Sequence, residues 1–109
     1  MSKKIKLYYE GKEYTLEFTR NTALALEQSG FSLADVRSKP VSSLVSLFNG
    51  AFVANHRRLE GSVVEKIFDS LKDKDKLLAA LVGMYDETVS SLMEDASEDE
   101  GNATWEMTP

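Results

Sequence analysis

The chain has no cysteine, which excludes disulfide bonds, thiolate metal sites and a cysteine nucleophile. It contains a single histidine and a single tryptophan among its 109 residues. No run approaches the ~18 consecutive apolar residues of a membrane-spanning helix. The basic start leads into only a few alternating apolar residues, unlike a secretory signal. We therefore expect a cytoplasmic protein that does not associate with a membrane.

Catalytic and metal-binding motifs are also missing. The only histidine, His56, has no second ligand type at a recognised spacing, and we expect it to complement the negative C-terminal end of a helix. No phosphate-binding loop, dinucleotide-binding fingerprint, nucleophile elbow or zinc-protease motif occurs. The acidic run at residues 94–100 lacks the spacing of a calcium loop. We expect a noncatalytic protein without cofactor, metal or small-molecule substrate.

Negative charge is concentrated near the C-terminus. The net charge is -5, and residues 94–109 contain six acidic side chains and no basic one. Residues 1–93 carry thirteen basic and twelve acidic side chains, which leaves them at +1. A nearly neutral body has no general affinity for a phosphate backbone and an acidic tail repels one, so we expect no nucleic-acid binding.

The composition, 42% apolar and 28% charged, predicts one globular domain, which we place at residues 1–95. Residues 96–109 are acidic and polar without periodicity, and they predict a disordered tail. Trp105 is the exception in this tail, because an isolated tryptophan can anchor a short segment on another protein. The other interpretation is that Trp105 folds back on its own domain or stays free.

The first elements are predicted to be two β-strands. Residues 3–18 alternate apolar and polar residues on both sides of Gly11, which is typical of a β-hairpin with its turn at residues 10–12. Ile5, Leu7 and Tyr9 share one face of the first strand. The apolar face of an isolated hairpin must be covered by the helices or continue into the sheet of a partner.

Residues 40–59 predict the central helix of the fold. Apolar residues recur at the spacing of one helical face, and Pro40 is suited to the first turn. Gly50 lies within this helix, and its presence indicates close helix packing, a tolerated glycine or a hinge. The apolar face consists of Leu44, Leu47, Phe48, Ala51, Phe52, Asn55 and Leu59.

Shorter helices are predicted on either side. Thr19 or Asn21 caps a helix that stops at Gly30, and Ser32 caps a helical turn. Ser62 and Glu65 have the spacing of a capping box, which predicts a helix from there to residue 72. The chain as a whole predicts an α+β, mainly α fold in which four to five helices, at about residues 20–94, follow an N-terminal β-hairpin.

The last predicted helix, residues 77–94, has an unusually wide apolar face. Further apolar residues widen its inner face to about half the circumference at ~100° per residue. The inner face consists of Leu77, Leu81, Met84, Tyr85, Thr88 and Leu92. This width is explained either by contact with the hairpin in one subunit or by contact with another subunit or partner. The additional residues are Leu78, Val82, Val89 and Met93.

Four segments carry a resemblance to a known family. They are Gly11-Lys12-Glu13-Tyr14 with the strand that follows, the helix end at residues 28–31, Leu47-Phe48 with Ala51-Phe52, and the closing residues 101–106 after an acidic linker. In this order they resemble the small tail assembly chaperones of siphovirus-type bacteriophages and prophages. The resemblance covers nearly the whole chain.

The resemblance implies a protein that binds the tape measure protein and keeps it soluble during tail assembly. The tail tube protein is a second candidate partner. It implies a location in the bacterial host cytoplasm and absence from the mature virion. We also expect a homo-oligomer. The alternatives are a structural head-tail connector or tail component, and a small regulatory protein-interaction domain.

A tape measure exposes long apolar helical stripes, so its chaperone needs apolar surface to cover them. The candidate surfaces are one edge of the central helix, the wide face of the last helix, and the tail. The same residues also fit a plain core. The candidate partner-binding residues are Val45, Phe48, Phe52, Leu78, Val82, Val89 and Trp105.

Overall fold

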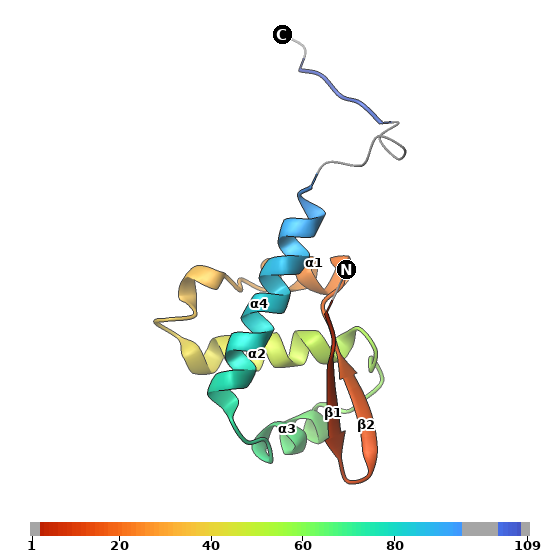
Figure 1. The fold of residues 1–109 in the computed structure, drawn as a ribbon, viewed down its shortest axis with the longest axis vertical. Coiled ribbons are helices and arrows are strands. Elements are labelled where there is room, and N and C mark those ends of the chain that lie inside the picture. The colour runs from red at the N-terminus through yellow and green to blue at the C-terminus, as the bar shows by residue number, and fades with distance from the viewer. Residues whose placement is uncertain (1–2, 95–102, 108–109) are drawn as a thin grey trace.

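A computed structural model describes residues 3–94 and 103–107 (Figure 1). Its elements confirm the expected α+β, mainly α fold, with an N-terminal antiparallel hairpin followed by four α-helices and one short 3-10 helix in the described residues. The strands are β1 (Ile5–Tyr9) and β2 (Lys12–Leu16), and the helices are α1 (Arg20–Gln28), a 3-10 turn (Leu33–Asp35), α2 (Pro40–Val53), α3 (Gly61–Asp69) and α4 (Lys74–Leu92).

The hairpin turns through Glu10 and Gly11 alone, and Lys12 already belongs to β2. Both turn residues have positive φ, 48° and 80°, as in the mirror-image turns whose twist suits a two-residue hairpin. The register places Leu7 opposite Tyr14, and both side chains are buried. On the outer face the Nζ atom of Lys6 lies 3.1 Å from a carboxylate oxygen of Glu13. The predicted apolar face is therefore confirmed, and the opposite face carries a charge pair between the strands.

Helix α1 begins with a reciprocal cap. The Thr19 side chain accepts a hydrogen bond from the backbone N–H of Thr22, whose own hydroxyl oxygen accepts from the N–H of Thr19 at 2.7 Å. The chain leaves the helix through Gly30 at a φ of 99°, a conformation that glycine adopts at little cost. Ser32 accepts from the N–H of Ala34 and caps the 3-10 turn. The predicted cap, stop and turn are confirmed.

Helix α2 is the centre of the core, as expected, but it ends at Val53 and not at Leu59. The reason is a contact that the helical pattern does not contain: Asn55 and His56 turn away to bond the backbone of β2. Gly50 allows α1 to approach closely, since a Cβ at this position would lie 3.0 Å from a terminal carbon of Leu26. Of the interpretations of Gly50, close packing is the one observed.

The starts of α3 and α4 differ from the sequence prediction. Glu60 is the N-cap of α3, Gly61 opens the helix, and neither Ser62 nor Glu65 forms the expected capping box. Asp73 precedes α4 with a φ of 55°, and its side chain makes no capping hydrogen bond. Both helices begin earlier than their apolar patterns suggest. Their first residues take part in the helical hydrogen bonding but contribute no side chain to the apolar face.

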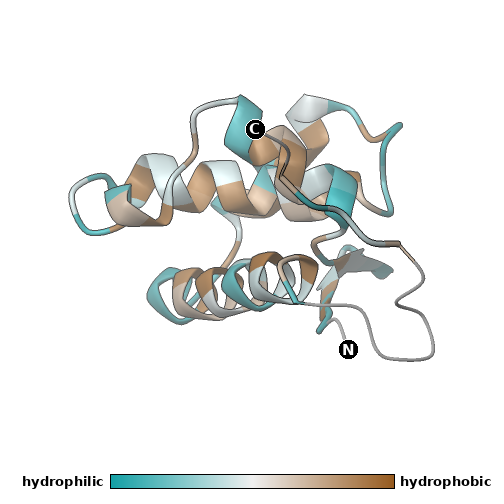
Figure 2. Ribbon diagram, turned by 90° about the horizontal axis from the view of Figure 1, so that it is seen from above, coloured by the Kyte–Doolittle hydropathy of each residue, from teal (hydrophilic) through white to brown (hydrophobic). Residues whose placement is uncertain are grey.

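Helix α4 packs against α1 and α2. Seen from above, α4 and the hairpin lie on the same side of α2 (Figure 2). Leu81, Met84 and Tyr85 are buried, which confirms the centre of the predicted inner face. Leu78, Val82 and Val89 are half-buried against the core. The remaining core residues are Leu7, Tyr14, Leu16, Phe18, Ala23, Leu26, Leu44, Leu47, Phe48, Ala51, Phe52 and Ile67.

Residues 103–107 have no regular secondary structure and are exposed. The prediction of a disordered tail at residues 96–109 falls mainly on residues 96–102 and 108–109, which lie outside the described residues. Within the described part of the chain, no helix combines the length and the apolar character needed to cross a membrane.

Candidate functional site

Three large apolar side chains remain exposed where α1 lies beside the C-terminal part of α4. Leu24 is 51% exposed, Leu92 is 48% exposed, and Met93, directly after the end of α4, is 80% exposed. Leu24 occupies the outer side of α1, whose inner residues Ala23 and Leu26 are buried. These exposed side chains therefore come from two elements that are about 70 residues apart in sequence and adjacent only in the fold.

A groove of about 450 Å³ runs between these two elements. We call it the α1–α4 groove, and its lining residues are Arg20, Ala23, Leu24, Glu27, Val89, Leu92 and Met93. A second hollow of about 390 Å³ adjoins it on the other side of Leu92 and is lined partly by Thr88 and Ser91. Five apolar side chains line the α1–α4 groove and two line the second hollow, so the groove is the candidate for binding apolar side chains.

A buried aromatic side chain of α4 lies near one end of the groove's rim. Tyr85 is buried, and its ring meets those of Phe18 and Phe31 edge-on, with centroids 5.5 Å and 5.2 Å apart. Burial raises the pKa of the Tyr85 hydroxyl, and the nearby Glu27 carboxylate raises it further. Edge-to-face aromatic pairs of this kind add to the packing of α4 against the core.

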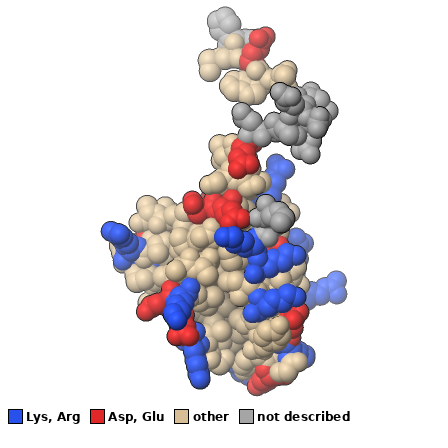
Figure 3. Space-filling view, viewed as in Figure 1, with Lys and Arg blue, Asp and Glu red and all other residues tan. Residues whose placement is uncertain are grey.

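The rim of the groove carries both signs of charge. Arg20 opens α1 and Glu27 lies near the end of the same helix, so the two charges flank Leu24. On the neighbouring surface, the Nζ atom of Lys3 lies 3.4 Å from a carboxylate oxygen of Glu87. Figure 3 shows basic and acidic side chains interspersed over the body, with uncharged surface between them. The charges can orient a polar flank of a ligand, while the apolar centre supplies contact area.

The α1–α4 groove has apolar side chains at its centre and charged side chains at its rim. In the described residues, no group of three or more histidine, cysteine, aspartate or glutamate side chains is placed to hold a metal. The groove contains no histidine, and its only titratable side chains are Arg20 and Glu27 at the rim. What the site offers is an open apolar surface between two helices.

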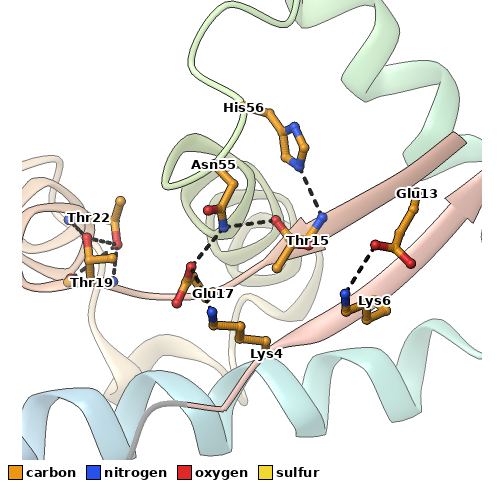
Figure 4. Close-up of polar contacts among 9 residues, drawn as sticks. All are labelled: Lys4, Lys6, Glu13, Thr15, Glu17, Thr19, Thr22, Asn55 and His56. Carbon is orange, nitrogen blue, oxygen red and sulfur yellow. Dashed lines mark hydrogen bonds and ion pairs between the residues drawn. The ribbon is translucent and has the colours of Figure 1, made fainter.

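Apart from the groove, a cluster of polar side chains joins the loop after α2 to the hairpin (Figure 4). The backbone N–H of Thr15 donates to Nε2 of His56 at 3.0 Å, and the side-chain N–H of Asn55 donates to the Thr15 carbonyl at 3.3 Å and to Glu17 at 2.9 Å. The expectation that His56 complements a helix end is therefore wrong, since α2 ends three residues earlier. This cluster fastens β2 to α2 and is structural.

The partner-binding residues predicted from sequence divide into three groups. Phe48 is 0% exposed and Phe52 is 2% exposed, so both are core residues and cannot form a binding surface on this fold. Val45 on α2 is 38% exposed. Trp105, in residues 103–107, is 86% exposed and forms the second, exposed group together with Val45. The third group is half-buried on α4 and consists of Leu78, Val82 and Val89. Of the seven residues, only Val89 lines the α1–α4 groove.

Sequence reasoning missed Leu24 as a surface residue. In isolation it is one of several strong helix formers in a short helix, and nothing in the local pattern indicates what lies beside it. Leu92 and Met93 were recognised only as part of a wide apolar face. The width of this apolar face was the available signal for a surface site, because a helix with one buried face needs fewer apolar residues.

Residues 1–108 match the model of a family described as "Domain of unknown function (DUF5055)". A search of curated proteins finds no match. A search of solved structures also finds none. The family description names no activity or partner.

Proposed function

We propose that this chain, which belongs to the DUF5055 family, is a noncatalytic phage tail assembly chaperone that binds the tape measure protein. Two independent lines support the proposal. One is the resemblance of the hairpin, the helix motifs and the closing Trp105 segment to such chaperones. The other is an exposed apolar groove on a small helical domain, a form suited to covering apolar helical surface.

The α1–α4 groove is the observation that carries the proposal. Leu24, Leu92 and Met93 expose apolar area on both sides of it. An amphipathic helix binds such a groove by inserting apolar side chains spaced three or four residues apart. A tape measure protein repeats such side chains along a long helical stripe, so many copies of the chaperone would cover one tape measure.

The charge distribution suits this role. Residues 1–93 are near neutrality at +1, which lets an apolar helix approach without strong repulsion. The six acidic side chains after residue 93 give every bound copy the same negative charge. Like charges on neighbouring copies oppose aggregation of the loaded complex. We propose that this assembly takes place in the bacterial host cytoplasm, with the chaperone as a homo-oligomer that is absent from the finished virion.

Co-expression with the candidate tape measure protein from the same genome tests the proposal. The tape measure protein is expected to be insoluble alone and soluble with this chain, and the two should co-purify. Leu24→Glu places a charge in the groove and should abolish this effect. Val41→Glu is the matched control, because Val41 is 73% exposed on α2 and lies outside the groove.

If the tape measure protein stays insoluble with the wild-type chain, the chaperone proposal fails. If solubility is gained and both variants retain it, the function stands but the α1–α4 groove is not the binding surface. Mass spectrometry of purified virions addresses the structural alternative, because a head-tail connector or tail component remains in the particle and a chaperone does not.

A further inference from the structure

The chain holds an open apolar groove and, separately, an exposed apolar segment. Trp105 is 86% exposed and Met107 is 87% exposed, the highest values among the large apolar side chains that the structure describes. Leu24 and Met93 on the α1–α4 groove are also exposed. Burying large apolar side chains against one another is favourable by ~25 cal/mol per Å², so each surface is a suitable partner for the other.

We propose that residues 103–107 dock into the α1–α4 groove of their own chain, with Trp105 as the anchor and Met107 beside it. The described structure is then the open form, in which the groove and the segment are both exposed. The closed form buries Trp105 against Leu24 and Val89. Tryptophan commonly supplies much of the free energy of a small interface, and methionine adapts to irregular apolar surfaces.

The length of the connecting chain favours docking within one molecule. Met93 itself lines the groove, and Trp105 follows it by twelve residues. A chain of twelve residues can reach at most roughly 40 Å, from ~3.3–3.6 Å per residue. The distance back to a groove that begins at Met93 lies within this reach. A short covalent connection keeps the segment near its own groove, which favours that groove over the groove of a second copy in dilute solution.

Charge also favours this occupant. Residues 94–100, which connect Met93 to the Trp105 segment, contain five acidic side chains and no basic one. Arg20 lies on the groove rim at the start of α1, and the first turn of α1 contains no acidic residue. The positive end of the helix dipole and the Arg20 guanidinium both attract the acidic connection. Glu27 and Glu87 lie in the same region and repel the acidic connection. The attraction by Arg20 therefore has to exceed this repulsion at close range.

Docking of the segment gives the groove a resident occupant that any other ligand must displace. That the docked segment competes with the tape measure protein rests on the proposed function. That the segment docks in the groove is independent of the proposed function. A resident segment would protect the apolar groove until a longer amphipathic helix replaces it. The apparent dissociation constant for that helix would equal its intrinsic value divided by the fraction of open molecules.

The single tryptophan makes docking directly measurable in the full-length chain. In the closed form, Trp105 fluorescence should be blue-shifted and its acrylamide quenching constant should be lower than that of tryptophan amide. Leu24→Glu should raise the quenching constant to the value for tryptophan amide, and Val41→Glu should leave it at the wild-type value. A wild-type quenching constant equal to that of tryptophan amide would overturn the proposal. So would equal effects of the two variants.

Protein concentration separates the chain's own groove from that of a second copy. Docking within one molecule predicts the same quenching constant over about a hundredfold range of concentration, whatever the oligomeric state of the chain. Quenching that falls as concentration rises, together with dimer formation, would overturn docking within one chain. These measurements use the chain alone, so their failure is independent of any failure of the tape measure experiment.

Discussion

His56 accepts a hydrogen bond through Nε2 from the backbone N–H of Thr15, with 3.0 Å between the two nitrogen atoms. Asn55, the preceding residue, donates to the carbonyl oxygen of the same Thr15. Two adjacent side chains after α2 therefore take up both backbone polar groups of one residue in β2. They cover part of a strand edge that would otherwise present unpaired groups to solvent or to another chain.

Replacing His56 by alanine removes the acceptor and leaves the Thr15 N–H without its partner. We expect His56→Ala to lower the free energy of unfolding by about 1 kcal/mol, measured by urea denaturation. Arg57→Ala, at an exposed neighbouring position, is the control and should change stability little. Equal stability of His56→Ala and wild type would mean that water replaces the imidazole without cost.

Truncating Phe48 distinguishes a core residue from a surface residue. Phe48 is 0% exposed and its ring packs against Phe52 at a centroid distance of 5.0 Å. Phe48→Ala should therefore destabilise the domain by about 3–5 kcal/mol, measured by thermal or urea unfolding. Val45→Ala, one turn away and partly exposed, should cost much less. Similar small losses for both variants would place Phe48 outside the core.

A larger residue at Gly50 should disturb the contact between α1 and α2. Gly50→Val forces Leu26 to move, because the added Cβ would lie 3.0 Å from a Leu26 side-chain carbon. We expect a loss of about 1–3 kcal/mol from overpacking. Gly83→Val on α4 is the matched control, since its added Cβ meets no atom within 4 Å and the helix-propensity change is the same.

Combining Gly50→Val with Leu26→Ala provides a second readout for the same contact. The double variant should lose less stability than the sum of the single losses, because the shortened side chain leaves room for valine. Additive losses, or a neutral Gly50→Val, would contradict the proposed close approach.

The raised pKa of Tyr85 predicts that the folded chain loses stability at alkaline pH. Its pKa lies above the ordinary value of 10.0 because burial disfavours the phenolate, and Glu27 adds repulsion. The folded chain then keeps the proton to higher pH than the unfolded chain. This contribution to stability is complete below the unfolded pKa and is lost as pH rises through the raised one.

Tyr85→Phe keeps the ring contacts and removes the titrating group, so it isolates this effect. Urea unfolding at about pH 8 and about pH 10.5 should show a larger loss of stability for wild type than for the variant. Parallel losses in the two proteins would mean that the Tyr85 hydroxyl ionises equally easily in the folded and unfolded chains.

The sequence predicted several elements because their causes are local. The alternation around Gly11 determines the hairpin, and Thr19 and Gly30 bound the first helix through the cap and the positive φ that the structure contains. Pro40 opens α2 as expected. In each case the residues that decide the conformation lie within a few positions of where it occurs.

The sequence predictions were wrong where contacts with distant segments override a local pattern. The helical face of α2 continues in sequence through Asn55 and Leu59, yet the chain leaves the helix because Asn55 and His56 bond Thr15, some 40 residues earlier. Ser62 has a capping motif that is not used. Phe48 and Phe52 share a helix edge that sequence alone cannot assign to core or surface, and the fold buries both.

The sequence by itself determined the class of the fold, the order of its elements and the residues able to form a core, because periodicity and turn chemistry act over short distances. Only the tertiary structure decided which apolar residues remain at the surface. Leu24 and Met93 lie side by side on the α1–α4 groove because α1 and α4 pack together. That packing depends on long-range contacts, which a single helical face does not encode.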